Sequence, residues 1–209
     1  MLRFGRADPL FLVMYGAVIL LAITLHEYAH AWTADRLGDP TPRREGRLSL
    51  NPLAHLDPVG AVMLALFGFG WARPVPINPW YFRDGRRGTL LVAMAGPLAN
   101  VTLAWVANLV LEMLDRSLFP AGWGVLVFTF LRTTVVLNLW LAAFNLIPIP
   151  PLDGSRILAG LVSHSQAVAL ARLEAYGPLL LVLLIVSGAS GMLLRPIFDV
   201  LRLLIGGFS

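Results

Sequence analysis

The chain has 209 residues, of which 57% are hydrophobic and 13% are charged, with a formal net charge of +4. Soluble domains carry roughly 25% charged residues, so this composition excludes an ordinary soluble domain and indicates a protein of the lipid bilayer. Every basic residue is an arginine, and most lie in short loops beside apolar runs, which suits an anionic lipid surface and argues against a nucleic acid partner.

Five apolar stretches are candidates for insertion into the membrane. They are residues 9–34, 58–72, 88–111, 133–152 and 175–194. A helix of about 20 residues covers the ~30 Å of a bilayer core, so four of the five are predicted to span it. Stretch 58–72 reaches only about 22 Å and contains three glycines, so it is either a re-entrant element or a short tilted crossing.

The arginines set the expected orientation of these stretches. Four lie between the first and second stretches and four between the second and third: Arg36, Arg43, Arg44, Arg47, Arg73, Arg83, Arg86 and Arg87. Arginine-rich loops favour the cytoplasm, and both loops can lie there if stretch 58–72 enters the membrane and returns. The alternative is a single tilted crossing with a further crossing near residues 119–130. We expect the re-entrant arrangement, with the N-terminus outside.

The predicted fold class is therefore an all-α polytopic membrane protein with about four to six transmembrane helices and a re-entrant element. We also expect a short β-like edge segment at residues 43–51, where alternating residues could pair with an extended substrate. Arg132 is expected to mark the outer edge of the span 133–152 by snorkelling. Residues 1–209 are predicted to form a single membrane-embedded domain, with a core at about 9–158 and a C-terminal span and tail at 175–209.

The motif His26-Glu27-Tyr28-Ala29-His30 carries the clearest chemical signal in the chain. Residues four apart project from one face of a helix, so His26 and His30 can share one metal ion. Glu27 lies about 100° round the helix, beside the open coordination position. Two histidines and a glutamate within an apolar span are costly, and such residues usually mark function rather than helix packing.

A catalytic zinc ion takes three protein ligands and one water, so the two histidines need a third partner. Because the chain has no cysteine, the partner must be His, Asp or Glu. The candidates outside obvious surface loops are His55, Asp57, Asp153 and His164. Asp153 is distinguished by the three prolines that precede it, because irregular backbone at membrane depth is tolerated only where it lines a cavity or is buried in protein. The predicted topology also places Asp153 at the depth of His26.

Four motifs occur together in the chain. They are the HEYAH motif, the run Gly46 to Gly60, the run Ala95-Gly-Pro-Leu-Ala-Asn100 and the run Asn145 to Gly154. In this order they resemble the compact branch, without PDZ or CBS domains, of the site-2 protease family of zinc intramembrane metalloproteases. The resemblance covers roughly residues 20–158. It implies that His26, His30 and Asp153 ligate one Zn²⁺ per chain and that Glu27 is the general base.

The resemblance also implies that Asn100 and Asn145 lie near the substrate strand or the oxyanion. His55 is either a hydrogen-bonding residue near the site or a polar cap on the re-entrant element. The expected activity is zinc-dependent hydrolysis of peptide bonds in or near the transmembrane segments of single-span client proteins. The expected location is a bacterial-type cell membrane, with the active site toward the cytoplasm. The main alternative is a transporter or channel with an intramembrane metal site, which the HEYAH spacing and the lack of a visible internal repeat disfavour.

Overall fold

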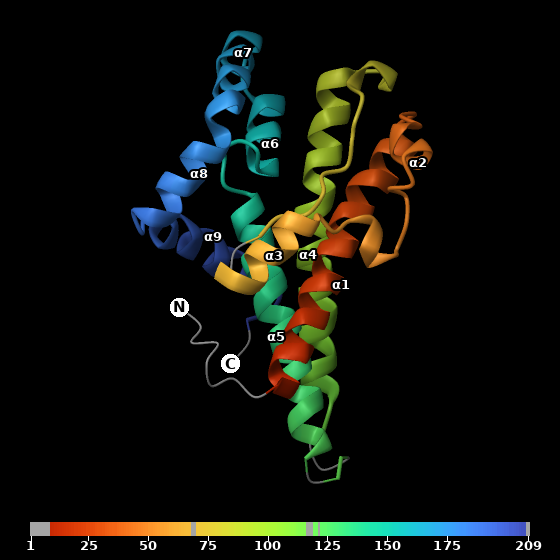
Figure 1. Ribbon diagram of the computed structural model, residues 1–209, viewed down its shortest axis with the longest axis vertical. Helices are drawn as coiled ribbons and strands as arrows, with labels where there is room; N and C mark the ends of the chain where they lie inside the picture. Colours follow the sequence, from red (N-terminus) through yellow and green to blue (C-terminus); the bar gives the residue numbers. More distant parts are fainter. Residues whose placement is uncertain (1–8, 68–69, 116–118, 121, 208–209) are drawn as a thin grey trace.

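Three long helices run side by side through the molecule (Figure 1). They are α1 (Pro9–Arg36), α4 (Gly85–Met113) and α5 (Trp123–Asn145). This computed structural model describes the chain except residues 1–8, 68–69, 116–118, 121 and 208–209. The shorter helices are α2 (Thr41–Arg44), α3 (Pro58–Phe67), α6 (Asp153–Leu161), α7 (His164–Leu173), α8 (Gly177–Val186) and α9 (Ser190–Leu204).

Within the described ranges, four helical stretches are long and apolar enough to cross a membrane, which confirms the predicted fold class. They are Pro9–Arg36, Gly85–Met113, Trp123–Asn145 and His164–Val186, the last running from α7 into α8. The span that begins at Trp123 was predicted to begin at residue 133, and the span that begins at His164 was predicted to begin at residue 175. The third ends at Asn145 because the prolines that follow cannot continue a helix. The fourth ends before Gly188, which has a φ of 73° and so adopts the left-handed conformation common after a helix end.

The position predicted for Arg132 is wrong. Arg132 lies inside α5, which begins at Trp123, instead of at the outer edge of a span. Residues 123–131 contain no proline and no charge that would break the helix, so the same helix continues through Arg132. Its side chain is exposed, and a long cationic side chain can reach the interface from within a span by snorkelling.

Small side chains allow the helices to approach closely. Ala104 and Ala107 of α4 and Ala142 and Ala143 of α5 are all buried in one hydrophobic cluster. Small residues at helix interfaces favour helix association in lipid, where the hydrophobic effect between helices is weak. The amphipathic helix α9 covers one side of α5, and the ring of Phe198 stacks on Trp140 with 4.4 Å between centroids.

The segment predicted to be re-entrant turns back on itself. Leu56 and Ala72 form an isolated antiparallel bridge, and the backbone N–H of Arg73 donates a 2.9 Å hydrogen bond to the carbonyl of His55. The ten-residue helix α3 lies between these paired ends. Because the two ends lie side by side, the segment between them cannot cross a bilayer once. This geometry agrees with a re-entrant element and disfavours the tilted crossing.

The β-like edge predicted at residues 43–51 is not found. Arg43 and Arg44 belong to α2, and the described part of the chain contains no strand there. Pro42 sits in the first turn of α2, where its fixed φ favours a helix. Arg47 points inward, with 3% of its surface exposed, and its guanidinium donates to the carbonyls of Ala54, Arg73 and Pro74. It therefore ties together the chain on the two sides of the re-entrant element.

Candidate metal centre

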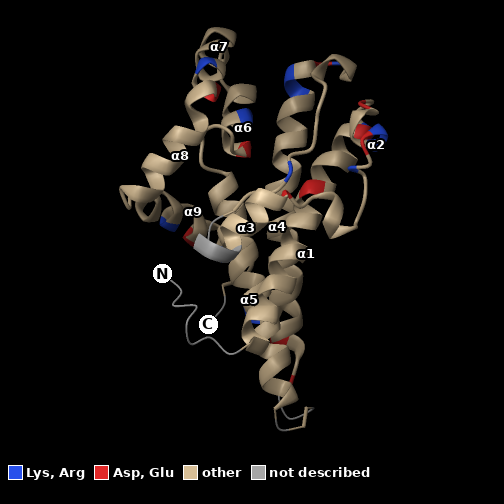
Figure 2. Ribbon diagram, in the orientation of Figure 1, with Lys and Arg blue, Asp and Glu red and all other residues tan. Residues whose placement is uncertain are grey.

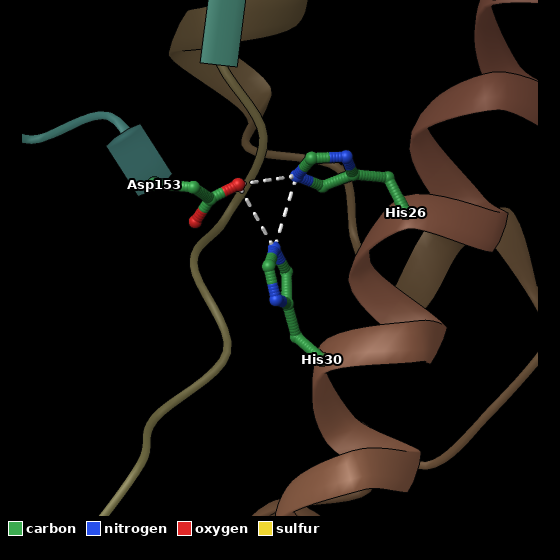
Figure 3. A group of neighbouring side chains, drawn as sticks. All are labelled: His26, His30 and Asp153. Atoms are coloured by element: carbon green, nitrogen blue, oxygen red, sulfur yellow. Dashed lines mark hydrogen bonds and ion pairs between the residues drawn. The ribbon is translucent and has the colours of Figure 1, made fainter. Parts of the chain in front are cut away.

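His26, His30 and Asp153 form the candidate metal centre, where their side chains point toward one another (Figure 3). The Oδ2 atom of Asp153 lies 3.1 Å from Nε2 of His26 and 3.2 Å from Nε2 of His30. The two Nε2 atoms are 3.0 Å apart. All three side chains are largely buried. Residues more than 120 positions apart in the sequence thus present three possible ligand atoms to one point.

The local sequence explains how each side chain reaches this point. His26 and His30 lie one turn apart on α1, so their rings project from the same face. Asp153 is the first residue of α6, after the proline-rich turn that ends α5. A Cβ atom at Gly154 would overlap the carbonyl groups of Leu146 and Ile147, so only glycine lets α6 start this close to the end of α5.

Gly96 of α4 makes room for the two imidazoles. A Cβ atom at this position would lie 2.6 Å from Nε2 of His26 and closer still to Nε2 of His30. Real Cβ contacts are essentially never shorter than 3.0 Å. The glycine in the Ala95-Gly96-Pro97 motif therefore allows the backbone of α4 to pass directly beside the histidine rings.

Hydrogen bonds determine which nitrogen of each imidazole carries the proton. Nδ1 of His30 lies 2.7 Å from the carbonyl oxygen of Val92, which can only accept, so this nitrogen is the donor. Nδ1 of His26 lies 2.6 Å from Oδ1 of Asn100. The Nδ2 of Asn100 donates to the carbonyl of Ala22 and to Asn138, which leaves its oxygen to face His26. In the neutral rings both Nε2 atoms therefore present lone pairs to the site.

This arrangement fits a bound cation. Two imidazole lone pairs and a carboxylate oxygen face one another without a proton to share, and Oδ2 of Asp153 is buried without a hydrogen-bond donor. Three such acceptors repel one another unless a positive charge lies between them. Two histidines and one carboxylate are a common ligand set for catalytic zinc, with a fourth position left for water. The outer hydrogen bonds to Nδ1 are also typical of metal-bound histidine.

The other residues singled out from the sequence have different settings, and of them Asn100 contacts the centre directly. Glu27 is adjacent to His26 on α1 and partly exposed. Asn145, at the end of α5, is partly exposed and donates a 3.0 Å hydrogen bond to the carbonyl of Leu141. His55 and Asn100 have no exposed surface. Nε2 of His55 lies 2.7 Å from the carbonyl oxygen of Ser49 and donates to it.

Two of the alternative third ligands lie in other settings. Oδ1 of Asp57 accepts a 2.8 Å hydrogen bond from the backbone N–H of Gly60 in the first turn of α3. His164 is the first residue of α7 and lies on the wall of a cleft. Among the described residues, the cluster that could hold a metal is made of His26, His30 and Asp153.

A cleft of about 650 Å³ leads to the centre. His30 is among its lining residues, and the rest of the lining comes mainly from segment 74–79, α4, α6 and α7. Arg86, Arg156 and Glu174 also line it. A second, apolar cavity of about 510 Å³ lies between α1, α3 and α5. None of His26, His30 and Asp153 lines this second cavity.

Three contacts at the centre were not predicted from the sequence. They involve the carbonyl of Val92, the missing side chain of Gly96 and the amide of Asn138. The first is a backbone atom, which residue identity does not reveal. For Asn138, the available signal was a polar amide inside the long apolar run of α5.

Comparisons with known proteins agree with this geometry. The model of peptidase family M50 matches residues 119–186. The chain is 37% identical to the protein named "Putative zinc metalloprotease YwhC" of Bacillus subtilis (strain 168), over 91% of this chain and 89% of that protein. It is 32% identical to "Putative zinc metalloprotease Rip2" of Mycolicibacterium smegmatis, over 81% of this chain and 65% of that protein. No solved structure matches the chain. The chain therefore belongs to peptidase family M50, the site-2 protease family, and is an intramembrane zinc metalloprotease.

Proposed function

We propose that His26, His30 and Asp153 hold the zinc ion of this protease, that Glu27 is its general base, and that single-span membrane proteins are its clients. The observation that carries this proposal is the convergence of the Nε2 atoms of His26 and His30 and a buried carboxylate oxygen of Asp153, all within 3.2 Å of one another. The residue types match a catalytic zinc site, and the HEYAH spacing places Glu27 beside it.

Zinc bound there would lower the pKa of a coordinated water to about 7 and polarise the scissile carbonyl. Glu27 accepts a proton as the water oxygen bonds to the carbonyl carbon, and it delivers that proton to the amide nitrogen as the C–N bond breaks. The products are one new carboxyl terminus and one new amino terminus. Asp153 and the two imidazoles keep their positions because α6 and the outer hydrogen bonds fix them.

The cleft and the apolar cavity suit a client that lies partly in the membrane. A transmembrane helix hides its amides in hydrogen bonds, so it must unwind before hydrolysis. The apolar cavity beside α1, α3 and α5 would take apolar client side chains, and the cleft that His30 lines would take the unwound segment and supply water. Asn145 is partly exposed at the end of α5, and we propose it as a contact for the client backbone.

We propose that the cleft opens to the cytoplasm of a bacterial-type cell. Most described arginines lie in the half of the molecule that contains α2, α6, α7 and the start of α4 (Figure 2). Arginine-rich ends of spans favour the cytoplasmic side. The N-terminus would then lie outside, and residues 1–209 would act as one membrane-embedded domain.

Cysteine labelling tests this orientation, because the chain has no native cysteine. Cysteines introduced at Gly38, after α1, and at Gly85, at the start of α4, should both react from the cytoplasmic side in intact cells. The reason is that the re-entrant element returns the chain to the side from which it entered. Labelling of the two positions from opposite sides would contradict the orientation.

Cleavage of a defined client tests the function. In proteoliposomes that contain the enzyme and a single-span protein, we expect one cut within or beside the client's apolar segment. A strong zinc chelator should abolish the cut, and added zinc should restore it, because the ion supplies the nucleophile. Sequencing of the new amino terminus locates the cut. A cut confined to a soluble domain, or one that the chelator leaves unchanged, would contradict the proposal.

A further inference from the structure

A chain of buried amides connects His26 to the middle of α5. Oδ1 of Asn100 faces Nδ1 of His26 at 2.6 Å, and Nδ2 of Asn100 donates a 2.8 Å hydrogen bond to Oδ1 of Asn138. Nδ2 of Asn138 in turn donates a 2.8 Å hydrogen bond to the carbonyl of Thr134. Both asparagines have no exposed surface. The chain thus crosses the interface of α1, α4 and α5, which pack side by side (Figure 1).

Each amide in this chain has a defined orientation. The carbonyl of Thr134 can only accept, so Asn138 turns its NH₂ group toward that carbonyl and its oxygen toward Asn100. Asn100 must then turn its NH₂ group toward Asn138 and its oxygen toward His26. An amide oxygen can only accept, so Nδ1 of His26 carries the proton. Nε2 of His26 is then left with a lone pair.

We propose that Asn138 is a positioning residue that acts through Asn100 to hold His26 in the tautomer that can bind zinc. The inference rests on the proposed zinc site. If the amide of Asn100 turned over, its NH₂ group would face Nδ1 of His26, and the ring would have to carry its proton on Nε2. That proton would block the nitrogen that faces Asp153. Asn138 and the carbonyl of Ala22 together oppose this reversal, because both accept from Nδ2 of Asn100.

The test measures zinc affinity of the full-length protein in detergent, by competition with a chelator. Loss of the outer partner of a metal ligand typically lowers metal affinity by roughly 10–100-fold. We expect Asn100→Leu to fall in this range and Asn138→Leu to cause a loss of about 10-fold, at the low end. Asn138→Asp should restore affinity, because a buried neutral carboxyl group can accept from Asn100 and donate to Thr134. The double variant should bind zinc no more weakly than Asn100→Leu, because Asn138 acts through Asn100.

Asn108 provides a matched control on α4. It is buried, and its Nδ2 atom donates to Glu112 and to the carbonyls of Ile205 and Gly207, far from His26 in the sequence. Asn108→Leu should lower the unfolding temperature and leave zinc affinity unchanged. Equal loss of zinc affinity in Asn108→Leu and Asn138→Leu would overturn the inference, because the effect would then be general destabilisation.

Two further results would also overturn it. One is wild-type zinc affinity in Asn138→Leu. The other is a loss of zinc affinity in the double variant that equals the product of the two single-variant losses, because that would show that the two residues act independently. His26→Ala separates this inference from the zinc site itself. If His26→Ala loses zinc while Asn138→Leu keeps it, the positioning role fails and the site stands. If His26→Ala keeps zinc, the proposed site fails.

Discussion

Glu27→Gln should retain zinc and lose cleavage. The substitution keeps the size of the side chain and removes the carboxylate that accepts the proton of the attacking water. A general base typically contributes about 10²–10⁴-fold to a rate, so we expect a loss of that size in kcat. Zinc content should stay at one per chain, because Glu27 is not among the three residues whose side chains converge.

The measurement is single-turnover cleavage of a reconstituted client, with zinc quantified in the same preparations. Glu45→Gln is a suitable control, because Glu45 is an exposed acid that directly follows α2. It should cleave at the wild-type rate. Parallel loss of zinc and activity in Glu27→Gln would show that Glu27 is a ligand, and the proposed division of roles would be wrong.

Gly96→Ala should disable the centre even though it adds only a methyl group. The new Cβ would overlap both imidazole rings, so α4 or the rings must move by a large fraction of an ångström. Misplacement of catalytic groups by about 1 Å can cost about 10²-fold in rate, and here the misplaced groups are the proposed ligands. We therefore expect at least that loss of activity, together with weaker zinc binding.

Gly191→Ala is the matched control for this substitution. Gly191 also lies within a helix, α9, but a Cβ there has no atom within 4 Å. Alanine is the better helix former, so this variant should be as stable as the wild type and fully active. Chelator competition and client cleavage measure both variants. Wild-type zinc affinity in Gly96→Ala would contradict the close passage of α4 beside the histidines.

Part of this molecule could be predicted because local rules decide it. The spacing of His26 and His30 places them on one helix face whatever surrounds the helix. The three prolines before Asp153 indicated irregular backbone beside a cavity, and the structure places Asp153 next to the two histidines. Four apolar stretches were expected to span, and four were found, because the thickness of the bilayer sets their length.

The failures have equally physical reasons. Alternation at residues 43–51 suggested a strand, but residues 43 and 44 end a helix that has Pro42 in its first turn, and the side chain of Arg47 turns inward to bond three carbonyls. Arg132 suggested the end of a span, although one cation within a long apolar helix can reach the interface. The contacts of Asn100 with His26 and Asn138 depend on how three helices pack, which the spacing of residues along the sequence does not encode.

The central claim is that Asp153 completes a zinc site with His26 and His30. Zinc affinity of Asp153→Ala, compared with that of Asp57→Ala, tests it most directly, because both aspartates were candidates for the third ligand. Asp57 instead accepts a hydrogen bond from the start of α3. We predict one zinc per wild-type chain and unchanged zinc affinity in Asp57→Ala. In Asp153→Ala, zinc affinity should fall by more than the roughly 10–100-fold that removal of an outer partner costs. Tight zinc binding by Asp153→Ala, with zinc lost from Asp57→Ala, would contradict the account.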